Sequence, residues 1–112
     1  MAYPDDAPLP EVEVEEAVAL VAAGVPLIDV REDYEWDAGH SPDAVSLPMS
    51  QLEHRLAELP DGSRFLVVCH SGARSARVTD FLVRDGYDAV NVAGGMLAWA
   101  AAGGAVVPTT EA

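Results

Sequence analysis

The stretch FLVVCHSGARSARVTDFL, residues 65–82, places four apolar residues before the single cysteine of the chain and a glycine-containing loop after it. A short, continuous apolar run is typical of a strand that is buried on both faces of a parallel sheet. Beyond the loop, Val78, Phe81 and Leu82 recur at helical spacing, so we expect all three to face inward. The stretch therefore predicts a strand, a loop and a helix, with Cys69 at the carboxyl end of the strand.

Short strands and helices alternate through the rest of the chain. Runs that predict further strands lie at residues 11–14, 25–30, 44–48 and 88–92, with an edge strand at 105–107. Helical turns are expected between them, at residues 15–24, 31–39, 49–56 and 96–102. This alternation is typical of an α/β domain with a mainly parallel central sheet, in which ligands bind at the carboxyl ends of the strands.

The segment after residue 48 carries a helix-start signature. Ser50 and Glu53 match the S-x-x-E capping box, in which the two side chains cap the first turn of an α-helix. Met49, Leu52 and Leu56 stand at helical spacing around it. We therefore expect an α-helix here, opened by Ser50.

The length of 112 residues provides for one domain. We place it at residues 11–108, between a flexible, Pro- and Asp-rich N-terminal arm (residues 1–10) and a short C-terminal tail (residues 109–112). No apolar run approaches the roughly 18 residues of a membrane span, and no signal peptide precedes the domain. With one cysteine no internal disulfide can form, so the sequence predicts a soluble, cytoplasmic protein.

The formal net charge is −13 and the chain contains no lysine. Phosphate backbones and acidic membrane surfaces would be repelled, so we predict no nucleic acid and no membrane partner. Around the cysteine the balance differs, because four of the six arginines (Arg64, Arg74, Arg77 and Arg84) lie there with Asp80 as the only acid between them. The sequence thus predicts a locally positive site that attracts a small anionic substrate.

The loop after Cys69 has the features of a reactive thiol site. Backbone N–H groups at a helix start are unpaired within the helix and favour negative charge. Together with Arg74 and Arg77, they are expected to shift the thiol toward thiolate, the nucleophilic form. Gly72 would allow the tight turn and the close approach of the backbone. The alternative is an inert cysteine buried as a small apolar residue.

Three motifs resemble one protein family. CHSGARS, residues 69–75, resembles the C-x-x-G-x-R-S active-site loop of rhodanese-like sulfurtransferases. Residues 27–48, LIDVREDYEWDAGHSPDAVSLP, are similar to the D-V-R, E and G-H-I segment of that family. Residues 85–103, DGYDAVNVAGGMLAWAAAG, match its G-G-M/I, A-W ending. The resemblance covers about residues 11–108.

The resemblance implies a rhodanese-like three-layer α/β domain with a mainly parallel central sheet of about five strands flanked by helices. It implies a thiosulfate sulfurtransferase in which Cys69 takes a sulfane sulfur from an anionic donor such as thiosulfate, becomes a persulfide, and passes the sulfur to cyanide or a thiol. A protein sulfur acceptor is a further expected partner, and no cofactor is expected. The substrate-binding loop carried over from the motif comprises His70, Ser71, Gly72, Ala73 and Arg74, with Ser75 in support.

Two other functions are compatible with the same loop. The domain could be a sulfur relay or regulatory module that serves one protein partner without turnover. It could instead handle phosphate or arsenate, but related folds that do so carry one more residue between cysteine and arginine. Here four residues separate Cys69 from Arg74, which favours sulfur.

Polar residues near the loop allow two interpretations each. Asp29, Arg31 and Glu35 could bind the donor or acceptor, but we favour an internal set of ion pairs and hydrogen bonds that orients the loop. His70 and Ser71 either rim the pocket or are exposed bystanders. The sequence departs from the family at Ser41, which we expect to be more exposed than an apolar residue, and at Asp43, which tolerates left-handed geometry.

The remaining candidate residues have simpler readings. His40, His54 and His70 show no metal-ligand spacing, so we predict no metal site. The tryptophans are expected to pack in the core or between helices. The glycine pair at residues 94–95 lacks the rest of a phosphate-binding motif and is read as a tight turn, so no nucleotide site is predicted.

Overall fold

Strand β4 (Phe65–Val68) lies at the centre of the sheet in the computed structural model, which describes residues 7–109. Within those residues the sheet has five strands, all parallel, in the order β1-β5-β4-β2-β3. The other strands are β1 (Glu11–Val12), β2 (Leu27–Asp29), β3 (Ala44–Ser46) and β5 (Ala89–Val92). The helices are α1 (Val14–Ala22), α2 (Asp33–Ala38), α3 (Ala73–Arg84) and α4 (Gly95–Ala101), with 3-10 helices η1 (Met49–His54) and η2 (Leu56–Glu58).

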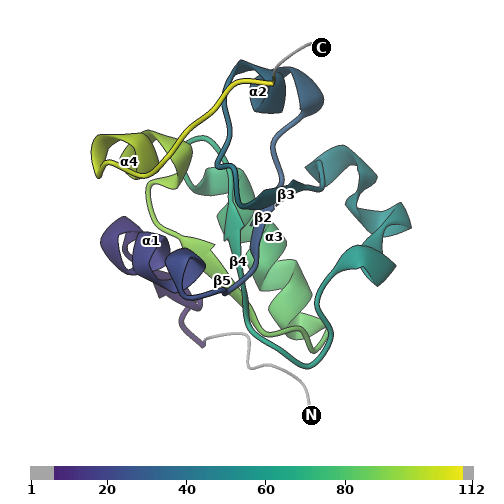
Figure 1. Cartoon of the computed structure of the whole chain (residues 1–112). Helices are drawn as coiled ribbons and strands as arrows, with labels where there is room; N and C mark the ends of the chain where they lie inside the picture. Colours follow the sequence, from purple (N-terminus) through teal and green to yellow (C-terminus); the bar gives the residue numbers. More distant parts are fainter. Residues whose placement is uncertain (1–6, 110–112) are drawn as a thin grey trace.

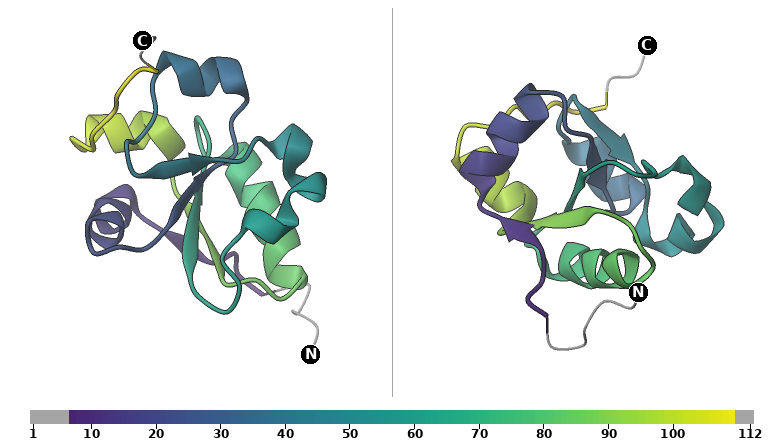
Figure 2. Two further views of the ribbon diagram at one scale, coloured as in Figure 1. Left: turned by 45° about the vertical axis from the view of Figure 1, so that its right-hand side comes forward. Right: turned by 90° about the horizontal axis from the view of Figure 1, so that it is seen from below.

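Each face of the sheet has its own apolar core, because successive side chains along a strand point to opposite faces. Phe65 and Val67 of β4 pack into one core with residues of α3 and the 3-10 segment, whereas Leu66 and Val68 pack into the other with residues of α1 and α4. All four side chains are 0% exposed. Figure 2 shows the resulting layers, with α3 on one side of the sheet and α1 and α4 on the other.

This arrangement confirms the predicted α/β class, the mainly parallel sheet of about five strands and the flanking helices. The carboxyl ends of β2 and β4, which are neighbours in the sheet, lead into α2 and into the cysteine loop. Figure 1 shows α2 lying beyond this end of the sheet, beside the chain that follows α4.

The predicted capping box after residue 48 is wrong. Residues 49–54 form the 3-10 helix η1, and no side chain caps its start. Pro48 holds the N-cap position and Ser50 is the second residue of the helix, while Met49 N–H donates to Val30 O (2.9 Å) beyond the end of β2. The Ser50 hydroxyl instead donates to Glu32 Oε1 at 2.7 Å.

Two other local predictions are corrected. Phe81 is 47% exposed, because the buried stripe of α3 runs through Ser75, Val78, Thr79 and Leu82 and leaves the neighbouring position 81 at the margin. Val78 and Leu82 face inward as expected. The predicted edge strand at residues 105–107 is not part of the sheet: Val107 forms only an isolated antiparallel bridge, with His40.

Residues 104–109 follow α4 as a segment that contacts both α4 and α2. The Trp99 indole N–H donates to Ala105 O at 3.0 Å, and His40 and Val107 exchange two backbone hydrogen bonds of 2.8 Å. Thr109 donates to Asp37 through both its N–H and its hydroxyl. This C-terminal segment therefore connects α4 with the end of α2.

The predicted arm and tail fall largely outside the described residues, since residues 1–6 and 110–112 are not described. Where the chain is described, Asn91 N–H donates to Pro10 O at 2.9 Å, so residue 10 already contacts the sheet. None of the helices found in residues 7–109 is long and apolar enough to cross a membrane.

Candidate active site

Cys69 follows β4 directly and lies at the carboxyl end of the central strands. Its side chain points to the α3 side of the sheet, where it is 1% exposed and packs in the same core as Val67 and Val78. The thiol is free. The strand thus places one sulfur atom beneath the loop that leads into α3.

The loop directs hydrogen-bond donors at this sulfur. Gly72 N–H donates to Cys69 Sγ at 3.2 Å, and the Ser75 hydroxyl lies 3.3 Å from Sγ and 3.3 Å from Gly72 O. Gly72 has φ +105°, a left-handed conformation that side chains disfavour, and an added Cβ there would lie 3.2 Å from Gly94 N. The chain therefore turns sharply at Gly72, where glycine is the residue type that best permits this conformation. Helix α3 begins there, with its first N–H groups directed toward the sulfur.

The pKa of the Cys69 thiol reflects two opposing effects. Burial raises it, because a thiolate loses hydration in the core. The Ser75 hydroxyl and the backbone N–H groups of Ser75, Gly72 and Arg74 lower it, since they donate to the charged form. The lowering effects prevail, so the pKa lies below that of an ordinary cysteine and the thiolate is favoured.

Replacing Ser75 by alanine is expected to raise the pKa of Cys69, because the variant loses the strongest of the lowering hydrogen bonds. The pH midpoint of thiolate formation, followed by ultraviolet absorbance and by the rate of iodoacetamide alkylation, should move to higher pH. The matched control is Thr79→Val, which removes another buried hydroxyl of α3 that has no hydrogen-bond partner among the described residues. An unchanged midpoint in Ser75→Ala would mean that the hydroxyl donates to Gly72 O instead.

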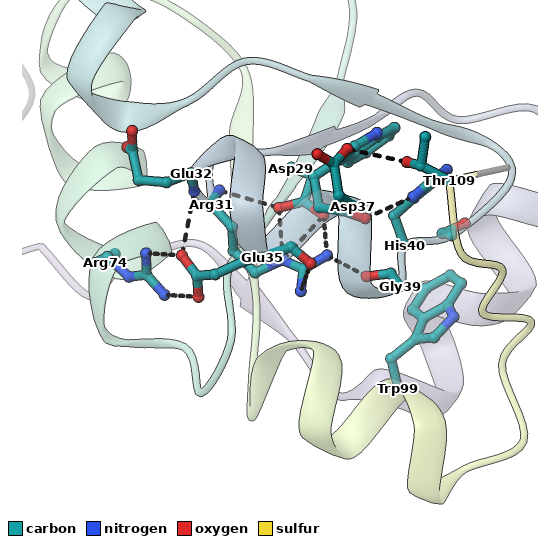
Figure 3. Close-up of polar contacts among 12 residues, drawn as sticks. Asp29, Arg31, Glu32, Glu35, Asp37, Gly39, His40, Arg74, Trp99 and Thr109 are labelled. Atoms are coloured by element: carbon teal, nitrogen blue, oxygen red, sulfur yellow. Dashed lines mark hydrogen bonds and ion pairs between the residues drawn. The ribbon is translucent and has the colours of Figure 1, made fainter. Parts of the chain in front are cut away.

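Arg74 is bound to Glu35 of α2 by two hydrogen bonds of 2.7 Å, the bidentate geometry of an arginine and a carboxylate (Figure 3). The hydrogen bond from Arg74 lowers the pKa of Glu35 to about 2, and the hydrogen bond to Glu35 raises the pKa of Arg74. Glu35 also accepts from Glu32 N–H as part of a capping box that starts α2. The ion pair therefore fixes the start of α3 to the start of α2.

Asp29 and Arg31 form a second, more deeply buried pair, with 1% and 6% of their side chains exposed. Arg31 Nη2 lies 2.8 Å from Asp29 Oδ2 and donates to Gly39 O at 2.7 Å, so it joins the end of β2 to the end of α2 (Figure 3). These contacts are of the kind expected from an internal set that orients the loop. The third member, Glu35, bonds Arg74 and accepts from Arg31 only through its carbonyl.

Replacing Glu35 by glutamine is expected to lower the free energy of unfolding by about 2 kcal/mol at pH 7, less than the full pKa shift implies because Arg74 is about one-third exposed. The pKa of Glu35 is depressed in the folded state, so its contribution is present above the ordinary value of 4.5 and is lost as pH falls toward 2. Urea unfolding at several pH values should show the variant and the wild type converging over that interval. Glu58→Gln, at the exposed ion pair with Arg55, is the control and should change little. A difference that persists unchanged at low pH would contradict this account.

The glycine pair read as a tight turn holds the cysteine loop from the other side. Gly94 precedes α4, and the first N–H groups of that helix donate to the loop: Met96 N–H to Cys69 O at 2.8 Å and Leu97 N–H to His70 O at 3.1 Å. A Cβ on Gly95 would lie 2.5 Å from both Cys69 O and His70 O. Sequence reasoning missed Gly95 as a residue of the site, and the adjacent glycines before a helix were the available signal.

The other predicted loop residues lie at the surface. His70, Ser71 and Ala73 are exposed. Of the loop, only His70 lines the two neighbouring hollows, of about 230 and 330 Å³, that open against α2. His70 therefore lies at the edge of these hollows, whereas Ser71 is exposed and lines neither of them.

The positive charge predicted around the thiol is largely neutralised by ion pairs. Arg64 faces Asp88 at 3.8 Å, Arg84 faces Asp80 at 3.1 Å, and Arg74 is held by Glu35. Arg77 is exposed and makes no ion pair with another residue of the described range. The site is therefore less positive than the local sequence indicated, because Glu35 and Asp88, which lie outside the segment between Arg64 and Arg84, pair with two of its arginines.

The departures from the family motif are accommodated within the fold. Ser41 is 1% exposed, contrary to expectation, and its hydroxyl accepts from Asp43 N–H at 3.3 Å. Asp43 is not left-handed, since no residue other than glycine has a positive φ in the described part of the chain.

The two tryptophans pack against other parts of the protein: Trp36 stacks on His40 with ring centroids 3.7 Å apart, and Trp99 is buried in the core. The described residues contain no cluster of three or more metal-ligating side chains.

Comparisons with known proteins agree with this architecture. The family model of the rhodanese-like domain matches residues 13–102. A sulfurtransferase of Allochromatium vinosum is 40% identical over 75 residues, which cover 66% of this chain and 70% of that protein. The "Putative sulfur carrier protein YrkF" of Bacillus subtilis is 35% identical over 74 residues, 65% of this chain and 40% of that protein.

The solved structure of a rhodanese-related protein from Thermoplasma volcanium has a TM-score of 0.83 at 28% identity, covering 89% of this chain and 99% of that one. The resemblance predicted from the three motifs is thereby confirmed. The cysteine loop, the parallel sheet that carries it and the match over residues 13–102 lead to one conclusion: the chain belongs to the rhodanese-like domain family.

Proposed function

We propose that this domain transfers sulfane sulfur through a persulfide on Cys69, from a donor such as thiosulfate to cyanide or a thiol. One observation carries the proposal: Sγ lies within reach of the Gly72 N–H and the Ser75 hydroxyl, with a lowered pKa, at the start of α3. A thiolate is the form of cysteine that attacks sulfur. Membership of the rhodanese-like family and relatives named as a sulfurtransferase and a sulfur carrier support sulfur transfer or relay.

The proposed reaction has two steps. The Cys69 thiolate attacks the outer sulfur of thiosulfate, a new S–S bond forms, and sulfite leaves with the electron pair of the broken S–S bond. The persulfide that results carries its negative charge on the outer sulfur, where the backbone N–H groups of residues 70–74 would stabilise it. Cyanide then takes the outer sulfur as thiocyanate, or a thiolate takes it as a persulfide, and the Cys69 thiolate is restored.

The other site residues would act by position. Arg74, held by Glu35, would keep the start of α3 in place, and Asp29 with Arg31 would keep α2 in place. Ser75 would tune the thiol through its hydroxyl, and His70 and Ser71 would face the incoming donor or acceptor. None of these roles needs a cofactor or a metal.

A sulfur relay without turnover is the second candidate, favoured by the relative named as a sulfur carrier. The two functions share the loading step and differ afterwards. An enzyme would return to the thiolate with small acceptors many times, whereas a relay module would load once and discharge rapidly only to its own partner. Steady-state thiocyanate production beyond one equivalent of the protein separates them.

The length of the loop argues against the phosphate and arsenate alternative. With four residues between Cys69 and Arg74, we expect no hydrolysis of aryl phosphates and no arsenate reduction.

The intact mass of the protein, before and after incubation with thiosulfate, tests the proposal. A gain of one sulfur atom that cyanide reverses is expected, and it should be absent when the thiol has first been alkylated. Because the chain has one cysteine, the alkylated protein is a complete control. No gain from thiosulfate, mercaptopyruvate or an organic persulfide would overturn the proposal.

A further inference from the structure

A groove of about 240 Å³ lies between α3 and the 3-10 helix η1, on the other side of the molecule's cysteine loop from α4. In the left view of Figure 2, the 3-10 segment (teal) lies beside α3 (green). The buried side chains of Leu52 and Val78 line the groove together with Met49 and Phe81. Met49 is 36% exposed and Phe81 is 47% exposed, so two large apolar side chains contact solvent around one hollow.

Two charged side chains complete the lining, Glu53 and Arg77. Both are exposed, and neither forms a side-chain hydrogen bond or ion pair within residues 7–109. Arg74 and Arg84 of the same helix each face a carboxylate. Arg77 therefore has its guanidinium available to a carboxylate of another molecule, although the chain carries a formal charge of −13. Aromatic residues, methionine and arginine are the side chains that protein interfaces favour.

The groove lies close to the proposed nucleophile without containing it. Leu52 and Val78 belong to the same apolar core as Cys69. Arg77 follows Arg74 by about one turn of α3, or about 5 Å along the helix axis. Cys69 itself is not part of the lining. A molecule that fills the groove and also reaches the sulfur must span both places, as a polypeptide can and a small sulfur compound cannot.

We propose that this groove docks the protein that accepts sulfur from Cys69, with one apolar side chain of the partner against Met49 and Phe81 and one carboxylate against Arg77. The proposal rests on the proposed function and specifies the acceptor. A cysteine thiolate of the partner attacks the outer sulfur of the Cys69 persulfide and forms a new S–S bond. The old S–S bond breaks, and Cys69 leaves as a thiolate with its electron pair. Docking accelerates this step because it holds the partner's thiolate near the persulfide.

The test uses synthetic acceptor peptides that begin with a cysteine and end, after four glycines, in a leucine and a glutamate. The spacer extends to at most about 14 Å. Two matched peptides replace the leucine by alanine or the glutamate by glutamine. Cys69 is first loaded from thiosulfate, the donor is removed, and the rate constant for loss of the sulfur to each peptide is followed by intact mass. In the wild type, the leucine should raise this rate constant about tenfold and the glutamate about threefold.

Two variants separate the contributions of the two contacts. Arg77→Gln should abolish the preference for glutamate and keep the preference for leucine. Phe81→Ser should reduce the preference for leucine to about threefold and keep the preference for glutamate. The controls are Arg84→Gln, a charge change in the same helix, and Val45→Ser, at an exposed apolar position of β3; neither residue lines the groove, and both ratios should stay at the wild-type values.

Four results would overturn the proposal. Equal rates for the three peptides, with the persulfide still discharged by cyanide, would remove the docking groove and leave the proposed function standing. A leucine–lysine peptide that is preferred over the leucine–glutamate peptide, with the preference lost in Glu53→Gln, would assign the contact to the opposite charge. A dimer in sedimentation velocity that Phe81→Ser dissociates would give the groove to a second copy of the chain. Failure of every donor to load Cys69 would overturn the proposed function and the docked acceptor with it.

Discussion

Replacing Cys69 by serine is expected to reduce sulfur transfer at least about 1,000-fold, to the background rate, while leaving the fold intact. An alcohol stays protonated at neutral pH and cannot form the persulfide, so the first step of the reaction is lost. The fold should tolerate the change because serine differs from cysteine in one atom. The Gly72 N–H and the Ser75 hydroxyl that reach Sγ can donate to an oxygen instead.

Thiocyanate formation and intact-mass analysis measure the loss of transfer, and thermal unfolding measures the fold. We expect the free energy of unfolding to change by no more than about 1 kcal/mol. Ser63→Ala, at an exposed position before β4, controls for handling and should retain full activity. Cyanide-reversible sulfur on the Cys69→Ser protein would show that another group accepts the sulfur, and the role proposed for Cys69 would then be abandoned.

The second large effect is expected at Gly95. Its φ of +60° costs a residue with a side chain about 1–2 kcal/mol. An alanine Cβ would in addition lie 2.5 Å from Cys69 O and His70 O, which are backbone atoms and cannot rotate away. Either α4 or the cysteine loop must move. We expect Gly95→Ala to lower the free energy of unfolding by about 3 kcal/mol and sulfur transfer by about 100-fold, since misplacing reacting atoms by about 1 Å can have that effect.

Gly103→Ala provides the matched control for this substitution. Gly103 also has a positive φ, +85°, but an added Cβ meets nothing within 4 Å. The control should therefore lose about 1 kcal/mol from backbone strain and keep its activity. Denaturant unfolding and the thiocyanate assay compare the two variants. If both lose the same stability and the same activity, the close approach of Gly95 to the loop has no part in the effect.

Local sequence patterns were sufficient to predict the structure where a single helix or strand determines the conformation of a segment. The apolar run at residues 65–68 predicted a buried strand, found as β4, and the position of Cys69 at its carboxyl end followed from the sequence as well. The Ser50 prediction failed because the 3-10 helix begins one residue earlier, at Met49, whose N–H donates to Val30 O from a different part of the chain. Tertiary contact outweighed a local signature there.

The ion pairs of the site could not be predicted from the sequence of the loop. Arg74 and Glu35 are 39 residues apart in sequence, so nothing in the loop itself indicated that its arginine is already paired. The approach of Gly95 to the Cys69 carbonyl likewise joins two strand ends that only the sheet order brings together. Such pairings depend on geometry that a single sequence does not encode at short range, whereas the residue types of the loop do indicate its chemistry.

The contacts around the cysteine loop close into a ring. Arg74 joins α3 to α2, the start of α4 bonds the cysteine loop, Trp99 bonds the C-terminal segment, and Val107 bonds His40 at the end of α2. Each link therefore also limits the movement of elements that it does not touch. A substitution at the C-terminal segment would be felt at the cysteine loop through α4 and through α2.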